Sequence, residues 1–262
     1  MDLGISGRRA AVAAGSAGLG LAIATRLAQA GVEVAVCGRD ESRLDGALES
    51  LRTAHSGSSS AALTTPGPQA FTADVSNPAG AQEFVERAAE ALGGPLDILV
   101  CNGGGPPPGT ATTTSIDAYR GAFEANCLAS IAMCEQAVPH MRGARWGRIL
   151  GITSIGARQP IGYLAASSVA RAGLTSYLKM LSTEIAADGV TVNNLQPGLH
   201  RTDRVTGLAG DQADALLSGI PTGTLGEADD FGAVAAFLCS QHASFVTGVG
   251  LQVDGGAFGG LQ

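Results

Sequence analysis

The 262-residue chain has few aromatic and charged residues and no long apolar run. Charged residues make up 15% of the sequence and apolar residues 45%, so the chain suits a compact globular protein and not a disordered one. No apolar run reaches the roughly 20 residues that span a membrane, and the start, MDLGISGRR, lacks the architecture of a signal peptide. No linker divides the sequence. We therefore expect a cytoplasmic protein with one domain that covers residues 1–262.

Basic charge and metal-binding patterns are also scarce. The formal net charge of -7 argues against nucleic acid or an anionic membrane as the main partner. The four histidines are dispersed, and the cysteines form no CxxC pair, so we predict no metal site and favour free thiols in a reducing compartment over disulfides. The five cysteines are Cys37, Cys101, Cys127, Cys134 and Cys239.

Short apolar segments alternate with helical patterns along the whole chain. Strands are expected at residues 9–14, 32–37, 69–73, 96–101, 149–152, 190–195 and 250–253. Helices are expected at 21–28, after residue 78, at 116–141 as one helix or two in succession, after residue 163, and at 229–239. This alternation predicts an α/β fold: a doubly wound parallel sheet of Rossmann type, in three αβα layers, with ligands at the carboxyl ends of the strands.

Two polar segments interrupt this pattern. Residues 53–68, TAHSGSSSAALTTPGP, have low complexity and predict a surface loop without chemistry. Residues 199–221 are polar, contain glycine and are weakly helical, a composition that suits a substrate lid.

A glycine-rich turn follows the first strand and precedes the first helix. Gly15, Gly18 and Gly20 permit a tight turn and close backbone approach, while a helix N-terminus offers free N–H groups to a phosphate. Glycine is abundant here, so the segment can also be turn material. Because strand, glycine loop and helix occur in this order, we favour a phosphate-binding loop.

The second strand ends at Gly38 and Arg39, where a βαβ unit faces the adenosine ribose. An acidic residue at this point would bind the two ribose hydroxyls of NAD, whereas an arginine suits the 2′-phosphate of NADP. A solvated arginine at a helix start is the alternative. The sequence therefore favours NADP over NAD.

Two further strand ends carry candidate contacts. The carboxylate of Asp74, next to Val75, can accept from an adenine amino group or cap the helix that begins after Pro78. Asn102 precedes three glycines and then three prolines. The glycines would let the backbone lie against a flat ligand, and the prolines would stiffen the segment that follows. The alternative is a stiff loop without a ligand.

The segment from Thr153 to Leu181 passes from a strand end into a long helix. Ser154 stands where the strand stops, and Ser167 and Arg171 are one turn apart on the helix. Asn126 lies within the helical segment before this strand. An asparagine inside a helix is more often a tolerated polar residue than a catalyst, and it becomes a candidate only because Ser154 follows.

Taken together, these landmarks resemble the short-chain dehydrogenase/reductase family over nearly the whole chain. They are the glycine loop Gly15–Gly20, Asp74-Val75, Asn102-Gly103-Gly104, Asn126, Ser154, Pro197-Gly198 with Thr202, and Asp254-Gly255-Gly256. The resemblance implies a Rossmann-type sheet, a nicotinamide cofactor, hydride transfer on an alcohol or carbonyl of a small molecule, and a homodimer or homotetramer. The expected cofactor-binding residues are Gly15, Ser16, Gly18, Leu19, Gly20, Arg39, Asp74, Val75, Asn102, Gly103, Gly104, Arg171, Pro197, Gly198 and Thr202. The candidate catalytic residues are Ser154, Asn126, Ser167, Arg171 and Tyr163.

The sequence departs from the family pattern in its glycine loop. The family loop reads Thr-Gly-x-x-x-Gly-x-Gly, and alignment on Gly18 and Gly20 places Ala13 and Ala14 at the first two positions. Ala14 adds a methyl group where the backbone normally turns tightly. We expect Gly15 to take over this turn and cofactor binding to persist, in a weaker or shifted form.

The second departure concerns proton transfer. The family places a tyrosine thirteen residues after the serine and a lysine four residues later, where this chain has Ser167 and Arg171. An alkyl hydroxyl is far less acidic than a phenol, whose pKa is roughly 10, and arginine holds its proton too tightly to relay it. Tyr163 is the nearby phenol, but Pro160 and Gly162 predict that the helix starts after it.

Three functions remain open from the sequence. The first is an NADP(H)-dependent oxidoreductase with an altered proton relay, in which Ser154 and Asn126 polarise a carbonyl and Tyr163 or a water supplies the proton. The second is a non-catalytic nucleotide-binding module, either a sensor or the inactive partner of an active subunit. The third is a non-redox reaction such as elimination or isomerisation.

Overall fold

The computed structural model describes residues 1–57, 66–203, 205 and 217–261, and it centres on a seven-stranded sheet. The strand order is β3-β2-β1-β4-β5-β6-β9, and every neighbouring pair is parallel. The strands are β1 Arg9–Val12, β2 Glu33–Gly38, β3 Gln69–Thr72, β4 Ile98–Cys101, β5 Gly147–Ile152, β6 Val190–Pro197 and β9 Gly250–Val253. A small second sheet pairs β7, His200–Arg201, with β8, Gly226–Glu227.

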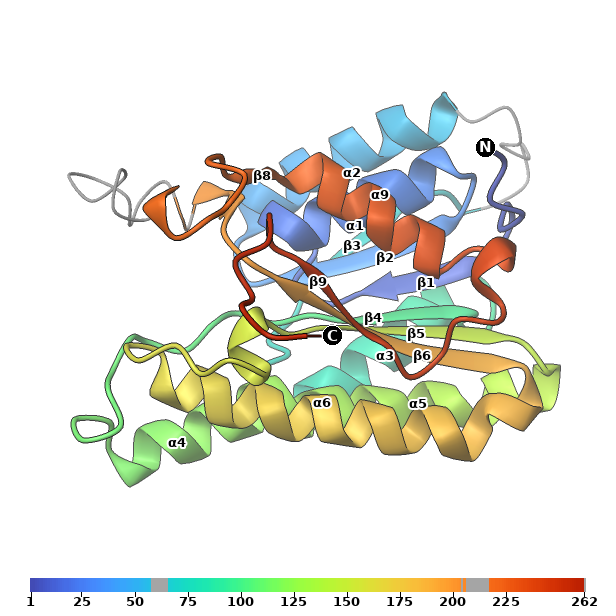
Figure 1. The fold of residues 1–262 in the computed structure, drawn as a ribbon. Helices are drawn as coiled ribbons and strands as arrows, with labels where there is room; N and C mark the ends of the chain where they lie inside the picture. Colours follow the sequence, from blue (N-terminus) through green and yellow to red (C-terminus); the bar gives the residue numbers. More distant parts are fainter. Residues whose placement is uncertain (58–65, 204, 206–216, 262) are drawn as a thin grey trace.

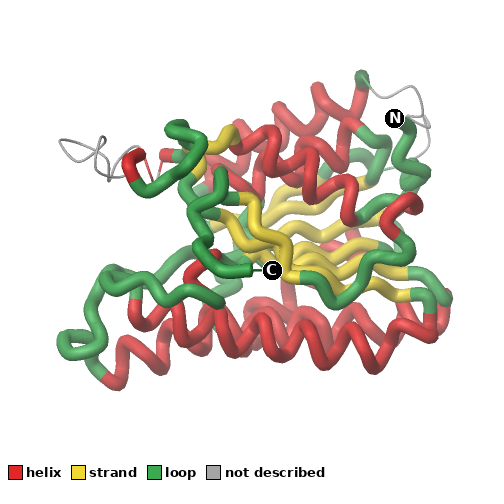
Figure 2. The backbone as a smooth tube through the Cα atoms, viewed as in Figure 1, coloured by secondary structure: helices red, strands yellow, loops and turns green. Residues whose placement is uncertain are grey.

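Helices cover both faces of the large sheet (Figures 1 and 2). In the view of Figure 1, α1, α2 and α9 lie above the sheet and α4, α5 and α6 lie below it. The helices are α1 Gly18–Gln29, α2 Glu41–Ser56, α3 Pro78–Ala91, α4 Ile116–Phe123, α5 Ala129–Ala144, α6 Ala165–Ile185 and α9 Ala228–Leu238. The predicted doubly wound α/β fold of three layers is confirmed.

The alternation of side chains along β1 explains why both layers can form. Ala10 and Val12 belong to the apolar cluster that also contains residues of α1 and α9, whereas Ala11 belongs to the cluster with residues of α3 and α5. Successive residues of a strand point to opposite faces of a sheet, so one short apolar strand contributes to both clusters.

Most predicted elements occur close to their predicted bounds, with physical reasons for the differences. The helix expected over 116–141 forms as two, α4 and α5, joined by a π-helical turn at Glu124–Leu128. Helix α6 begins at Ala165, after Tyr163, as predicted. Strand β1 ends at Val12, so Ala13 and Ala14 already belong to the turn that follows.

Part of the loop predicted over residues 53–68 is helical instead. Helix α2 continues to Ser56, and the hydroxyls of Thr53 and Ser56 donate back to helix carbonyls. Residues 58–65 lie outside the described residues, and so do 204 and 206–216 of the lid predicted over 199–221. Across the described helices, none is both long enough and apolar enough to cross a membrane.

Candidate active site

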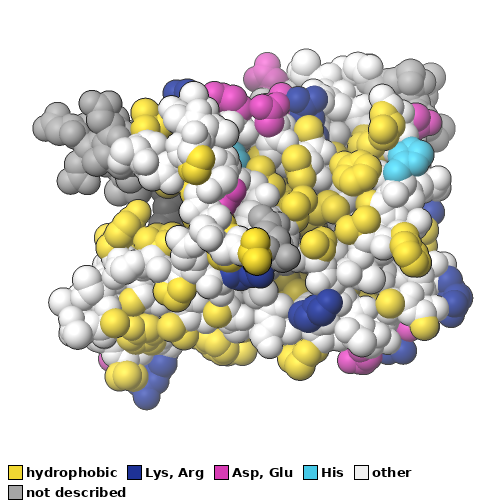
Figure 3. Space-filling view, in the orientation of Figure 1, with side chains coloured by type: hydrophobic (Ala, Val, Ile, Leu, Met, Phe, Trp, Pro, Cys, Tyr) yellow, Lys and Arg dark blue, Asp and Glu magenta, His cyan; other side chains and the backbone are white. Residues whose placement is uncertain are grey.

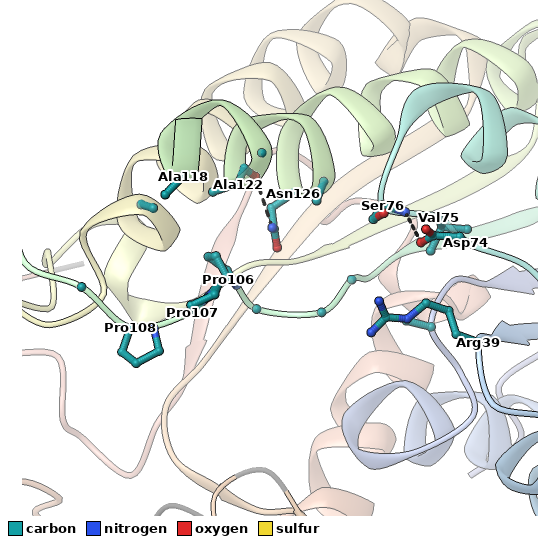
Figure 4. Close-up of a pocket in the computed structure, with 18 of the residues that line it drawn as sticks. Arg39, Asp74, Val75, Ser76, Pro106, Pro107, Pro108, Ala118, Ala122 and Asn126 are labelled. Carbon is teal, nitrogen blue, oxygen red and sulfur yellow. Dashed lines mark hydrogen bonds between the residues drawn. The ribbon is translucent and has the colours of Figure 1, made fainter. Parts of the chain in front are cut away.

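A cavity of about 810 Å³ lies at the carboxyl ends of the central strands. Its walls come from the residues after β1, β2, β3 and β4, from α4 and the π-helical turn, and from the start of α6. Seven predicted site residues line it, namely Ser16, Arg39, Asp74, Val75, Gly103, Gly104 and Asn126. Figure 4 shows Arg39 and Asp74 on one side of this cavity and Asn126 with Pro106, Pro107 and Pro108 on the other.

The backbone turns tightly between β1 and α1. Ala14 has a φ of +48°, the left-handed region that favours glycine, whereas Gly15 is not among the residues of positive φ. The expectation that Gly15 takes over this turn is therefore wrong, because Ala14 makes the turn itself. Asn102 holds the turn in place: its Nδ2 atom donates to the carbonyls of Ala13 at 3.2 Å and Ala14 at 3.3 Å.

The start of α1 leaves its first backbone N–H groups without a side-chain cap. The residue before the helix, Ala17, makes no side-chain bond to it, and the first turn contains no acidic residue. Such a helix start has free donors and the positive end of the helix dipole. At Gly20 a Cβ atom would clash with the carbonyl of Ala14, so only glycine allows this close approach of helix and turn.

The end of β2 provides the basic part of the cavity. Arg39 lines the cavity, and a side chain at Gly38 would clash with Ser16 of the glycine-rich turn. Arg43, which the sequence analysis missed, is a second cation on this wall, and its guanidinium lies 3.9 Å from the carboxylate of Asp203. Its spacing of four residues from Arg39, at the start of a helix, is the signal that could have revealed it.

Two carboxylates accompany these arginines. Asp40 caps α2, and bonds from the backbone N–H of Arg43 and the hydroxyl of Ser42 hold its pKa below the ordinary value. Asp74 accepts from the backbone N–H of Ser76 at 3.1 Å and lines the cavity. The alternative that Asp74 caps the next helix is wrong, because Asn77 caps α3 by accepting from Gly80 at 2.9 Å.

Ser154 lies two residues after the end of β5 and caps a short 3-10 turn. Its Oγ atom accepts from the backbone N–H of Gly156 at 3.0 Å, so the hydroxyl hydrogen is not used in that bond. The preceding residue, Thr153, is tied to β6 through its N–H to Leu195 and its hydroxyl to Asn194. A hydroxyl fixed at the end of a rigid strand can donate to an oxygen placed above it.

Ser167 and Arg171 form a buried pair on α6. The Nε atom of Arg171 donates to Oγ of Ser167 at 3.3 Å, and another guanidinium nitrogen donates to the carbonyl of Ile152 at 2.8 Å. Both side chains are 8% exposed. Arg171 therefore joins α6 to the last residue of β5, two positions before Ser154.

Asn126 occupies the π-helical turn between α4 and α5. Its Nδ2 atom donates to the carbonyl of Ala122 at 3.2 Å, while its buried Oδ1 atom has no hydrogen-bond partner among the described residues. Tyr163 is 53% exposed and precedes α6, and its backbone carbonyl accepts from Gly109 at 2.8 Å. The structure thus places Asn126 in the wall of the cavity and Tyr163 in the surface loop beside it.

Several predicted residues support the site without lining the cavity. A Cβ atom built on Gly18 would lie 3.6 Å from Cγ2 of Thr202, so the segment after β7 packs on the glycine-rich turn. Gly198 donates to Val253 at 3.0 Å and joins the end of β6 to β9. The lining of the cavity, over the described ranges, does not include Gly15, Gly18, Leu19, Gly20, Asn102, Ser154, Tyr163, Ser167, Arg171, Pro197, Gly198 or Thr202.

Known proteins are similar to this chain in sequence and in architecture. The family model described as enoyl-(acyl carrier protein) reductase matches residues 13–257. The 3-oxoacyl-(acyl-carrier-protein) reductase FabG of Chlamydia pneumoniae is 32% identical over 256 residues, 98% of this chain and 99% of that protein. The FabG protein of Escherichia coli (strain K12) is 30% identical over 256 residues, with the same coverage of both chains.

Solved structures agree with the sequence comparison. The L-sorbose reductase from Gluconobacter frateurii, complexed with NADPH and L-sorbose, is 28% identical to this chain and has a TM-score of 0.89. The match covers 100% of both chains. YwfH, an NADPH-dependent reductase involved in bacilysin biosynthesis, is 27% identical with a TM-score of 0.89, over 98% of this chain and 100% of that one. The chain therefore belongs to the short-chain dehydrogenase/reductase family of oxidoreductases.

Proposed function

We propose that this protein is an NADP(H)-dependent oxidoreductase that interconverts a carbonyl and an alcohol on a small molecule, with an altered proton relay. One observation carries the proposal: a single cavity extends from Arg39, at the end of β2, to Asn126, between α4 and α5. A dinucleotide bound at the carboxyl ends of a doubly wound sheet needs an anion site and a reacting end in one continuous space.

The residues present fit such a cofactor. The uncapped start of α1 and the glycine-rich turn would hold the pyrophosphate, because free N–H groups and a positive dipole end meet there. Asp74 and Val75 would border the adenine, and Gly103 and Gly104 would lie along the nucleotide, since all four line the cavity. When bound, the nicotinamide supplies or accepts the hydride.

The basic end favours NADP(H) over NAD(H). Arg39 and Arg43 both line the cavity, and the clash with Ser16 excludes an acidic side chain at Gly38. A guanidinium binds a phosphate with two parallel bonds, whereas an acidic residue would repel it. Two similar proteins are described as an NADPH-dependent reductase and as a reductase complexed with NADPH.

The proton relay is where we expect this chain to differ from its relatives. Ser154 would polarise the carbonyl, since its Oγ atom accepts from Gly156 and keeps its hydrogen for donation. Ser167 replaces a phenol and Arg171 replaces an ammonium group, and both are bound to each other. The proton would therefore come through Tyr163 or through water, with Ser167 as a weak donor.

The same pair supports a second candidate, a non-catalytic nucleotide-binding module. The group that Arg171 supports is the alkyl hydroxyl of Ser167, which is a far weaker acid than a phenol. Catalysis needs a donor matched to neutral pH, and binding does not. A sensor or an inactive partner subunit would need the nucleotide-binding cavity but not the proton relay.

We also propose a homodimer or homotetramer. Apolar side chains gather on the surface over α4 and the start of α6 (Figure 3), and Ile116, Phe123 and Val169 are exposed there. Exposed apolar patches of this kind mark contact surfaces. Light scattering during size-exclusion chromatography measures the subunit number directly.

The main test compares cofactor binding with turnover. NADPH and NADH are titrated by protein fluorescence, and NADPH absorbance is then followed with ketones, aldehydes and quinones. We expect tighter binding of NADPH and slow reduction of a ketone, which Ser154→Ala lowers by about 100-fold without changing NADPH affinity. Binding without oxidation across the whole panel would support the non-catalytic module. Products formed without any absorbance change would point to non-redox chemistry.

A further inference from the structure

The cavity has a charged end and an uncharged end. Charged side chains, those of Arg39, Asp40, Arg43 and Asp74, line the part next to β2 and β3. The opposite part, which we name the proline–alanine lobe, is formed by Pro106, Pro107, Pro108, Ala118, Ala122 and Ala166. Figure 4 shows the labelled members of the two groups on opposite sides of the cavity. Because the charged end suits the phosphates of a nucleotide, the lobe remains for the substrate.

We propose that the substrate is an uncharged carbonyl compound with an apolar body, which packs against the proline–alanine lobe. This inference rests on the proposed function, since it names the substrate class of the same cavity. It goes further because it excludes carboxylate, phosphate and ammonium groups from the part of the substrate that enters the lobe.

The backbone of the lobe offers few hydrogen-bond donors. Pro106, Pro107 and Pro108 are consecutive, and proline has no backbone N–H group. The N–H of Gly109, which follows them, donates to the carbonyl of Tyr163 at 2.8 Å. An anionic group facing this wall would therefore find no backbone donor from these four residues.

The hydroxyl groups at the rim of the lobe are bonded within their own loop. Thr113 accepts from the backbone N–H of Thr110 at 3.0 Å, and Thr114 donates to the carbonyl of Thr110 at 2.7 Å. Ser115 accepts from Ala118 at 3.2 Å, because it caps α4. The hydrogen of the Thr114 hydroxyl is used within the loop, whereas the bonds accepted by Thr113 and Ser115 leave their hydroxyl hydrogens available. The described rim therefore offers neutral hydroxyl groups but no charged partner, and neutral groups compensate only in part for the lost hydration of a charged ligand.

Asn126 adds a neutral amide and no charge to the wall beside the lobe. One hydrogen of its Nδ2 atom is donated to the carbonyl of Ala122, and its Oδ1 atom is an acceptor without exposed surface. The carbonyl oxygen of Ala122 can only accept a hydrogen bond, so it must face the NH₂ group of Asn126 and not its Oδ1 atom. Among the described lining residues, the lobe therefore presents methyl groups and proline rings.

Desolvation then decides the substrate class. A charged group moved from water into an apolar site without a partner loses its hydration at a large cost, whereas an apolar group gains from the same transfer. The lobe should therefore bind a neutral ligand at least about 10-fold more tightly than the charged analogue of that ligand. Alanine, proline and glycine are also small, which leaves room for a bulky body.

The experiment uses two ketones with the same carbon skeleton, 2-octanone and 7-oxooctanoate, with NADPH and the full-length protein. We expect a kcat/KM for 2-octanone at least about 10-fold above that for 7-oxooctanoate. Ala118→Arg places a cation in the lobe from an exposed position on α4, and it should lower this ratio by about 10-fold or reverse it. Ala111→Arg is the matched control: it makes the same substitution at an exposed residue of the loop before α4, outside the cavity, and the ratio should stay within about twofold.

A second measurement separates this inference from the proposed function. Binding of 2-octanol and 7-hydroxyoctanoate to the protein saturated with NADPH is measured by calorimetry. No hydride can pass between an alcohol and the reduced cofactor, so the heat reports binding alone. If no ketone is reduced but 2-octanol binds selectively and Ala118→Arg removes that selectivity, the proposed function fails and the inference stands. If ketones are reduced without discrimination against the carboxylate, or if neither alcohol binds, the inference is overturned. A ratio that Ala111→Arg changes as much as Ala118→Arg would also overturn it.

Discussion

The guanidinium of Arg171 donates to the hydroxyl of Ser167 across one turn of α6, with 3.3 Å between Nε and Oγ. The same guanidinium reaches the carbonyl of Ile152 at the end of β5. These two side chains therefore form a buried link between helix and sheet. The resemblance to the family implies that these helix positions would carry a proton donor and the cation that activates it, so our proposal places the difference from the relatives at proton transfer.

The first prediction concerns restoration of a phenol. Ser167→Tyr combined with Arg171→Lys should raise kcat for ketone reduction by about 100-fold, because a positioned general acid contributes about 10²–10⁴-fold. NADPH affinity should change little, and the gain should appear in single-turnover measurements of the chemical step. Arg171→Lys alone is the control and should give no gain, since the donor is still missing. A double variant slower than the wild type would indicate that Ser167 already takes part in an effective relay.

A second prediction tests the basic end of the cavity. Arg39→Ala should weaken NADPH binding by about 10- to 100-fold, because a charge-assisted bidentate contact to the 2′-phosphate is lost. NADH binding should change less than about twofold, and the difference should shrink at high ionic strength. Arg52→Ala removes a cation from the exposed side of α2, outside the cavity, and should affect neither cofactor. Equal losses for NADPH and NADH would contradict the assignment of the 2′-phosphate to Arg39.

The sequence predicted the parallel sheet and the approximate ends of its strands well, for a physical reason. Buried parallel strands appear as short apolar runs, and their carboxyl ends must meet at one edge of the sheet. Residues at those ends, such as Arg39, Asp74 and Asn102, could therefore be assigned to one site before their positions were known. The start of α6 was also predicted, because Pro160 and Gly162 disfavour a helix before Tyr163 and the helix begins at Ala165.

Other features depend on contacts that no local pattern contains. The proline–alanine lobe is made by segments far apart in the sequence, and alanine carries no signal of its own. Arg43 reaches the cavity only because α2 starts at Glu41. Asn77, and not Asp74, caps α3 because the backbone places Asn77 directly before the helix. Composition does not determine that placement.

The strained turn at Ala14 gives a third prediction. Ala14→Gly should raise the free energy of unfolding by about 0.5–1 kcal/mol, because relief of a left-handed alanine outweighs the greater flexibility of glycine in the unfolded chain. Urea unfolding measures the change. Gly15→Ala is the matched reverse substitution and should be destabilising, since its Cβ would lie 2.8 Å from Cγ1 of Val36. Equal effects of the two substitutions would show that the turn conformation does not govern stability.

The last prediction concerns His200, a buried histidine that the sequence left without a role. Its ring packs edge-on against Phe231, with 5.0 Å between centroids, and Nδ1 lies 3.4 Å from the carbonyl of Gly198. Burial lowers its pKa below the ordinary value of 6.5, and the nearby carboxylates of Asp254 and Glu227 offset this only in part.

A lowered pKa in the folded state fixes the sign of the pH dependence. Above about pH 6.5 the imidazole is neutral in both states, and the stabilisation from burying it is fully present. As pH falls below 6.5, the unfolded chain takes up a proton before the folded one, so this stabilisation is lost by up to about 1.4 kcal/mol per pH unit. His200→Phe should therefore flatten the fall in unfolding free energy between pH 7 and pH 5, whereas His140→Gln, at an exposed position on α5, should leave the slope unchanged. An unchanged slope in His200→Phe would mean that acid destabilisation comes from other groups.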